Sequence, residues 1–115
     1  VEDLAAEIAH AAAPAPVWPS ISANGVEDAL TSVMTSVRGL ERIAALSFHL
    51  TAIEMMVAAQ ATELRGVAAR LGPRMAALQA AIRQHAAPLE DDRPLRQEID
   101  ALAATLASEA FPPAP

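Results

Sequence analysis

Residues 30–64 read LTSVMTSVRGLERIAALSFHLTAIEMMVAAQATEL, and this stretch decides the fold. Its apolar side chains recur at steps of three and four residues, which is the spacing of a helix face and not the alternation of a β-strand. We expect Gly39 to bend this helix and Gly66, behind Arg65, to end it as a C-cap glycine. The expected buried stripe comprises Leu30, Val33, Met34, Val37, Leu40, Ala44, Leu46, Leu50, Ile53, Val57, Ala61 and Leu64.

Proline and capping signals divide the rest of the N-terminal half. Residues 4–13 form a short helix that stops before Pro14, because proline lacks a backbone N–H and restricts the residue before it. Asn24 and Glu27 have the spacing of a capping box, which predicts a helix start. The expected organisation is a single all-α domain fragment, with residues 1–13 as a short helix, 14–25 as a proline-rich loop, 26–110 as a bundle of long helices and 111–115 as a frayed tail.

Two further helices are expected in the C-terminal half. Gly72-Pro73 places proline in the first turn of one helix, which ends before Pro88. The other starts around Arg93-Pro94, where the acidic run Glu90–Asp92 complements the positive end of the helix dipole. Their expected apolar stripes are Leu71, Met75, Leu78, Ile82 and His85 in the first helix, and Leu95, Ile99, Leu102 and Leu106 in the second.

The composition fits one folded domain and excludes several classes of protein. Apolar residues make up 53 % of the 115 residues and charged residues 19 %, which rules out wholesale disorder. The absence of Cys excludes a disulfide scaffold and a thiolate zinc site. A net charge of −6, with no Lys, disfavours a nucleic-acid partner. Three scattered histidines lack metal-ligand spacing, so we expect no metal.

Small apolar side chains predict self-association. Alanine makes up about a quarter of the chain, so helices can pack closely while each buries little area. A stripe of such residues is expected to contact a second copy, and its members are Ala58, Ala61, Leu64 and Ala68.

Residues 43–61 are apolar enough to raise the question of a membrane span. His49 and Glu54 lie near the middle of this stretch, where a carboxylate costs about 2.5–3.5 kcal/mol. We therefore expect a bundle helix and no membrane partner. The first residues, Val1-Glu2-Asp3, include neither an initiator Met nor the basic region of a signal peptide, so we expect a piece of a longer, cytoplasmic protein.

Several side chains in these helices have both a structural and a catalytic interpretation. For Glu54, an ion pair with an arginine of a neighbouring helix or subunit is favoured over proton transfer. His49 and His85 are expected at a helix surface or core edge rather than as catalysts. Met55-Met56 is expected to pack, and the run Glu90–Asp92 to open a helix rather than bind a cation.

Three stretches follow one another in a recognisable order, namely P-A-P-V (14–17) with S-A-N-G-V-E-D (22–28), A-I-E (52–54) with A-A-Q-A-T-E-L-R (58–65), and P-L-E-D-D-R-P-L (88–95) with E-I (98–99). Together they resemble the P-A-x-V…S-A-N-x-E-D, A-(I/V)-E…A-A-Q-A-x-(D/E)-L-R and P-L-E-D-D-R-P-L-x-x-(D/E)-I motifs of the histidine and aromatic amino-acid ammonia-lyases. The three motifs cover most of the chain.

The resemblance implies the C-terminal portion of an enzyme that eliminates ammonia from histidine or an aromatic amino acid to give an α,β-unsaturated acid. Members of that family are homotetramers of long helices, and their active sites are assembled from several subunits. Their electrophile, 4-methylideneimidazole-5-one, forms from an internal Ala-Ser-Gly. This sequence contains no Ala-Ser-Gly and no Tyr, so the resemblance implies that the fragment alone is inactive and that the parent enzyme supplies the group.

Glu27 is the catalytic candidate that the resemblance implies. It matches the acidic position of N-Q-E-D in histidine ammonia-lyases, which phenylalanine and tyrosine lyases usually replace by Gln. Its carboxylate could orient a substrate imidazole or assist proton transfer, while the alternative is that it only completes the capping box, and the two roles can coexist. Residues 24–31 read NGVEDALT where the family has N-Q-E-D-H-V-S-M, which leaves the substrate, and lyase or aminomutase activity, open.

A free-standing helical adaptor or oligomerisation module is the alternative function. Such a module would bind partner helices through its apolar stripes. A long encoded sequence upstream of Val1 that contains Ala-Ser-Gly would favour the enzyme, and a start codon a few residues upstream would favour the adaptor.

Overall fold

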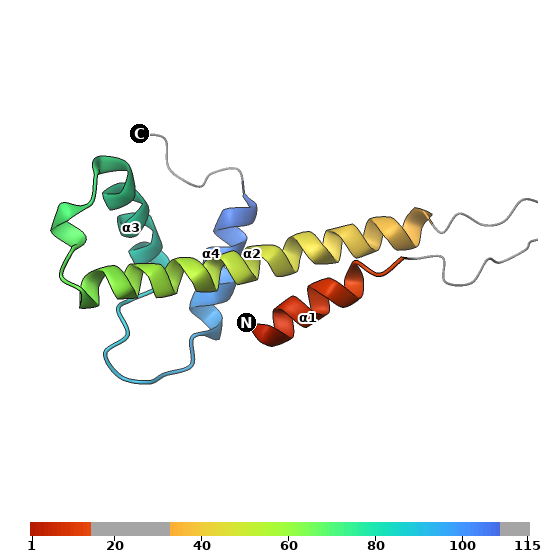
Figure 1. The fold of residues 1–115 in the computed structure, drawn as a ribbon, viewed down its shortest axis with the longest axis horizontal. Helices are drawn as coiled ribbons and strands as arrows, with labels where there is room; N and C mark the ends of the chain where they lie inside the picture. The colour runs from red at the N-terminus through yellow and green to blue at the C-terminus, as the bar shows by residue number, and fades with distance from the viewer. Residues whose placement is uncertain (15–32, 109–115) are drawn as a thin grey trace, which may run out of the picture. The chain divides into compact units, whose positions relative to one another are not determined.

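The computed structural model describes residues 1–14 and 33–108, and every regular element within them is helical. The expected all-α class is therefore confirmed. The proline-rich loop beyond Pro14, the Asn24–Glu27 capping box and the tail 111–115 lie outside the described residues. In chain order the elements are α1 (Glu2–Ala11), α2 (Val33–Leu64), the short 3-10 helix η2 (Ala68–Arg70), α3 (Pro73–His85) and α4 (Arg96–Ala107), as Figure 1 shows.

The chain divides into two compact units, one of residues 2–46 and one of residues 47–115 with Val1. In the first unit, α1 carries Glu2 and Asp3 in its first turn and His10 in its last, so its charges complement the helix dipole. An exposed ion pair joins Glu7 of α1 to Arg42 of α2, with 2.6 Å between Oε2 and Nη2. The expected helix over residues 4–13 thus begins and ends two residues earlier in the structure.

Gly39 does not bend α2. The helix runs without interruption from Val33 to Leu64, so the expected bend is wrong. A glycine costs a helix about 1 kcal/mol, which the many helical hydrogen bonds on either side can absorb. The structure gives Gly39 another role, because a Cβ atom there would lie 3.3 Å from the carbonyl oxygen of Ala11. The missing side chain therefore allows α1 and α2 to approach closely.

The core of the second unit is built mostly from small side chains. Helices α3 and α4 lie beside the second half of α2 (Figure 1), and Leu102 is the largest fully buried side chain among the described residues. The expected α4 stripe and the packing role of Met55-Met56 are confirmed. The buried cluster comprises Ala52, Met56, Ala59, Ile82, Ala86, Leu102 and Ala103, and it is covered by Phe48, Met55, Leu78, Leu95, Ile99 and Leu106.

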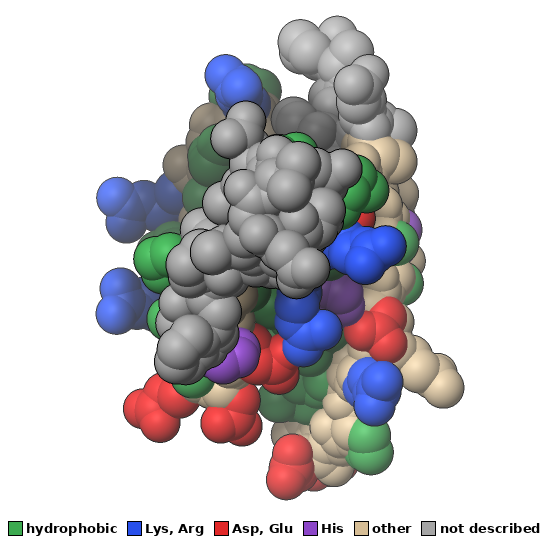
Figure 2. All heavy atoms as spheres, turned by 90° about the vertical axis from the view of Figure 1, so that its right-hand side faces the viewer, with side chains coloured by type: hydrophobic (Ala, Val, Ile, Leu, Met, Phe, Trp, Pro, Cys, Tyr) green, Lys and Arg blue, Asp and Glu red, His purple; other side chains and the backbone are tan. Residues whose placement is uncertain are grey.

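The apolar stripe expected along α2 is wrong in its register. Val57 is 63 % exposed and Leu64 is 78 % exposed, whereas Met56 is in the core. Because successive helical residues are about 100° apart, the face that carries Met56 meets α3 and α4 while Val57 faces solvent. Hydrophobic side chains also reach the surface among charged ones in Figure 2. In the N-terminal half of α2, the exposed hydrophobic residues are Val33, Met34, Val37 and Leu40.

The expected helix-end signals at Gly66 and Pro73 are seen in the structure, whereas the expected start of α4 is wrong. Gly66 adopts a positive φ of 63°, and its N–H donates to the carbonyl of Glu63, which confirms the C-cap. Pro73 is the first residue of α3, also as expected. Helix α4 begins at Arg96 rather than around Arg93-Pro94, and Glu98 is the acidic residue of its first turn. The acidic run at residues 90–92 therefore lies outside the helix start, in an exposed loop.

Helix α2 is long and apolar enough to cross a membrane, with a mean hydropathy of 1.4 over its best window. This finding rests on the length and composition of the helix, and the core helices of soluble proteins pass the same test. Little of the window is buried within the chain.

Candidate functional site

A network of polar side chains joins α2 to α3, and it centres on Arg83. The Arg83 guanidinium donates two hydrogen bonds to the Glu63 carboxylate, from Nε to Oε1 and from Nη2 to Oε2, both 2.8 Å long. It also donates to the carbonyl of Ala86 and to the side-chain oxygen of Gln60. Gln79 donates a further bond to Glu63 at 3.0 Å. We call Arg83, Glu63, Gln60 and Gln79 the Arg83 network.

The Arg83 network is shielded from water, which strengthens its charged hydrogen bonds. The Arg83 side chain is only 15 % exposed and that of Glu63 is 29 % exposed. The hydrogen bonds from Arg83 hold the pKa of the Glu63 carboxyl below its ordinary value, against the opposing effect of burial. Glu63 is therefore ionised at neutral pH, and the two-point geometry fixes the orientation of α3 on α2.

Gln60 ties the loop after α3 to α2. Its side-chain NH2 donates to the carbonyl of Leu89, and its oxygen accepts from the N–H of the same residue, both at 3.0 Å. One amide thus satisfies both backbone groups of Leu89. This bond brings together two of the sequence motifs, A-A-Q-A-T-E-L-R at residues 58–65 and P-L-E-D-D-R-P-L at residues 88–95.

A second network closes the same loop onto α4. Arg93 forms an ion pair with Glu98 and donates to the carbonyl of Ala87 at 3.1 Å, while the N–H of Ala87 donates to Glu98 at 3.3 Å. The hydrogen bond from Arg93 lowers the pKa of Glu98, and the same bond raises the pKa of Arg93. We call these three residues the Arg93 network. Helix α4 starts at Arg96, so Arg93 lies in the loop and its side chain bonds to Glu98 in the first turn of the helix.

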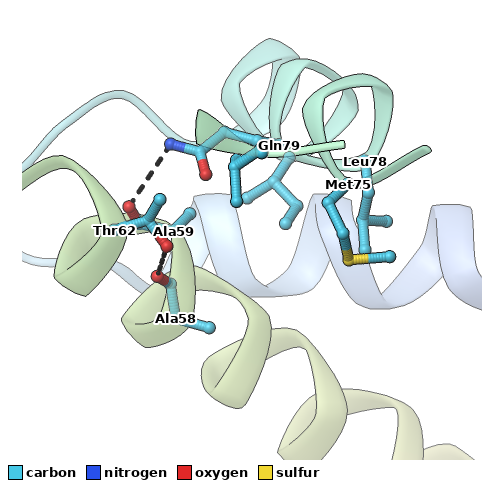
Figure 3. A pocket seen from close by; sticks show the side chains of 8 residues that line it. Ala58, Ala59, Thr62, Met75, Leu78 and Gln79 are labelled. Carbon is cyan, nitrogen blue, oxygen red and sulfur yellow. Dashed lines mark hydrogen bonds between the residues drawn. The ribbon is translucent and has the colours of Figure 1, made fainter. Parts of the chain in front are cut away.

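A small apolar cavity of about 100 Å³ lies between α2 and α3 (Figure 3). Its polar groups are already bonded, since Thr62 Oγ1 donates to the carbonyl of Ala58 at 2.8 Å and Gln79 donates to the carbonyl of Ala59 at 3.4 Å. The cavity therefore suits an apolar group and holds no side chain poised for chemistry. Its lining residues are Ala58, Ala59, Thr62, Leu71, Met75, Leu78, Gln79 and Ile82.

Two histidines and Glu54, which have both structural and catalytic interpretations in the sequence, lie at partly buried or exposed positions. His49 Nε2 lies 3.2 Å from Asp100 Oδ1 at a partly exposed contact between α2 and α4. His85 is partly buried and lies 3.4 Å from the hydroxyl of Thr105. Glu54 is exposed, so its carboxylate is solvated by water and needs no partner. No ion pair to Glu54 is found among the described residues.

No group of three or more metal-binding side chains is found within residues 1–14 and 33–108. Glu27 lies outside the described residues, so its place relative to the other motifs stays a prediction. The sequence has no Ala-Ser-Gly from which the electrophile of the ammonia-lyases forms, and it has no Tyr. These residues therefore do not supply that group.

Comparisons with known proteins agree with the motifs. The model of the aromatic amino acid lyase family matches residues 1–84. The chain belongs to this lyase family. A histidine ammonia-lyase of Symbiobacterium thermophilum is 40 % identical to this chain over 90 residues, which are 78 % of this chain and 18 % of that relative. The chain thus spans less than a fifth of the relative that it matches. No solved structure matches it.

Sequence reasoning missed the residues that hold these helices together. The motifs give no role to Gln60 or Glu63, and they place Arg93 at a helix start instead of in an ion pair. The only signal for Gln60 and Glu63 is that each is a polar residue next to an apolar one within a motif. Arg83, which lies outside every motif, carried no such signal.

Proposed function

We propose that this chain supplies the helical C-terminal portion of an amino-acid ammonia-lyase that eliminates ammonia from histidine or an aromatic amino acid to give an α,β-unsaturated acid. The observation that carries the proposal is the 40 % identity to a histidine ammonia-lyase over 78 % of the chain. The chain alone is expected to be inactive, because it has no tripeptide precursor of the electrophile.

The described residues contribute support and assembly to this function. The Arg83 network ties residues 58–65 to α3 and, through Gln60, to Leu89, while the Arg93 network ties the loop after α3 to α4. Residues of two family motifs thus help to fix α2, α3 and α4 together. A site built from several segments needs such rigid supports, since small displacements of catalytic groups lower the rate steeply. In the proposed parent enzyme, four copies associate as a homotetramer and bind a small amino acid.

A chimaera tests the proposed function. We would replace the aligned segment of the Symbiobacterium thermophilum histidine ammonia-lyase with this chain and follow formation of the unsaturated acid from histidine, phenylalanine and tyrosine by absorbance. We expect turnover of at least one substrate by the chimaera and none by the isolated 115 residues. A folded chimaera that contains the electrophile but deaminates none of the three would overturn the proposal, as would turnover by the isolated chain.

Glu27 is proposed to face the substrate in that enzyme. Glu27→Gln keeps a side chain that can close the capping box, so it should change stability by no more than about 0.5–1 kcal/mol. If the carboxylate holds the substrate or a moving proton, kcat/KM of the active chimaera should fall by roughly 10²-fold or more, and most for histidine. Glu54→Gln, which alters an exposed carboxylate of α2, is the matched control and should leave kcat/KM unchanged. Equal kcat/KM for both variants would leave Glu27 as a helix cap.

A further inference from the structure

Three unpaired arginines lie close in sequence to residues that line the cavity between α2 and α3. Arg65, Arg70 and Arg74 are exposed and have no ion pair or side-chain hydrogen bond within the described part of the chain. Arg70 directly precedes Leu71 and Arg74 directly precedes Met75, and both Leu71 and Met75 line the cavity. Arg65 follows the lining residue Thr62 by three positions, and Met75 is 47 % exposed. This surface therefore combines an apolar hollow with positive charge.

The loop after α3 has the complementary chemistry. Leu89 exposes 37 % of its surface and is followed directly by Glu90, Asp91 and Asp92, which are exposed and unpaired in the described residues. The loop is held in place, because Gln60 bonds both backbone groups of Leu89 and leaves its side chain free to make contacts. An apolar side chain followed by three carboxylates is thus presented on a fixed backbone.

The sizes of the two surfaces also agree. An apolar cavity of roughly 150 Å³ in another protein accepts benzene, so a hollow of about 100 Å³ suits one aliphatic side chain. Leu89 is not among the residues that line the hollow, so the loop does not fill the cavity of its own chain. The acidic run beside Leu89 complements the charge of the arginines, which favours a second copy as the occupant.

We propose that residues 88–92 of one copy dock onto the arginine-flanked cavity of a second copy, with Leu89 in the hollow and Glu90–Asp92 facing Arg65, Arg70 and Arg74. This inference deepens the proposed self-association, on which it rests, and names the surfaces that meet. Opposite charges at such a contact set partner choice and association rate, while the buried apolar side chain adds affinity.

A charge-swap experiment with the full chain tests the contact. One variant carries Arg70→Glu with Arg74→Glu, and the other carries Asp91→Arg with Asp92→Arg. Each variant alone places like charges on both surfaces, so its association constant, measured by sedimentation over a concentration series, should fall by about tenfold or more. Mixing the two variants restores opposite charges on every pair of surfaces, so the mixture should associate about as tightly as the unaltered chain.

Three further variants separate this contact from general charge effects, and a salt series tests its electrostatic part. Arg38→Glu makes one such charge reversal on an exposed part of α2 and should leave association unchanged. Leu89→Ala and Ala58→Met, which remove the docking side chain and fill the hollow, should each weaken association while circular dichroism shows the same helicity. Raising the salt from about 0.1 M to about 1 M, which shortens the Debye length from roughly 10 Å to 3 Å, should weaken it as well.

Two results would overturn the docking contact. A chain that stays monomeric at every concentration removes it together with the proposed self-association. A chain that associates, but equally well in both charge variants and in Leu89→Ala, removes the contact alone and leaves self-association to another surface. Neither result bears on the family of the chain, because mass and not turnover is measured.

Discussion

Replacing Arg83 by Met should destabilise the unit of residues 47–115 by about 2–3 kcal/mol. Arg83 makes two hydrogen bonds to the Glu63 carboxylate and one each to Gln60 and the carbonyl of Ala86. Hydrogen bonds to charged groups contribute about 1.5–3 kcal/mol each, but bonds that share one side chain are not additive. The loss leaves a carboxylate that is only 29 % exposed with Gln79 as its remaining side-chain donor, so desolvation of Glu63 adds to the cost.

Urea unfolding followed by circular dichroism measures this effect, at one protein concentration because association would also change the apparent stability. Arg96→Met is the matched control. The Arg96 side chain is 91 % exposed and lies 3.6 Å from Asp100, so its loss should cost no more than about 0.5 kcal/mol. A cycle with Glu63→Gln should give a coupling of about 1 kcal/mol or more between Arg83 and Glu63. Equal costs for Arg83→Met and Arg96→Met would refute the importance that we give to the network.

Three further outcomes follow from the same structure. Gly66→Ala should cost about 1 kcal/mol in urea unfolding because φ is positive there, whereas Gly72→Ala should cost less than about 0.5 kcal/mol because its φ is −65° and nothing lies within 4 Å of the new Cβ. Leu102→Ala should cost about 2–4 kcal/mol and Leu64→Ala, at a position 78 % exposed, less than about 0.5 kcal/mol. The pKa values of the Glu63 and Glu98 carboxyl groups are lowered in the folded chain. The free energy of unfolding should therefore be highest above the ordinary carboxyl pKa of 4.5 and fall as the pH drops below it. A free energy of unfolding that stays constant between pH 6 and about pH 3 would contradict this.

The helices were predictable because their signals are local. Apolar spacing, Gly66 after a basic residue and Pro73 in a first turn act within a few residues, and the structure reproduces α2, its end and the start of α3. The buried face of α2 was not predictable from spacing. Apolar residues lie on more than one of its faces, so the packing of α3 and α4 decides that Met56 is buried and Val57 is not.

The candidate site was also predictable only in part. Motif resemblance identified residues 58–65 and 88–95, but their hydrogen-bond partners depend on the path of the chain between them, which includes the turn at Gly66 and the 3-10 helix Ala68–Arg70. The late start of α4 has a similar cause. Local charge favoured a start near Arg93, whereas the bonds from Arg93 to Ala87 and Glu98 exist only once α4 has packed beside the loop.

The weight of polar contacts in this unit follows from its composition. An alanine gives little apolar area to a core, and Leu102 is the largest side chain that is fully buried among the described residues. The loop between α3 and α4 is anchored to the core only at its two ends, by Ala86 and Leu95, and the backbone groups between them still need partners. Gln60 and Arg93 supply those partners directly. The hydrogen bonds of amide and guanidinium groups are directional, so they fix the loop in one position. Apolar contacts have no such directionality and would hold the loop less precisely. A loop fixed in this way presents Leu89 and the acidic run that follows it in a constant geometry, as docking between copies requires.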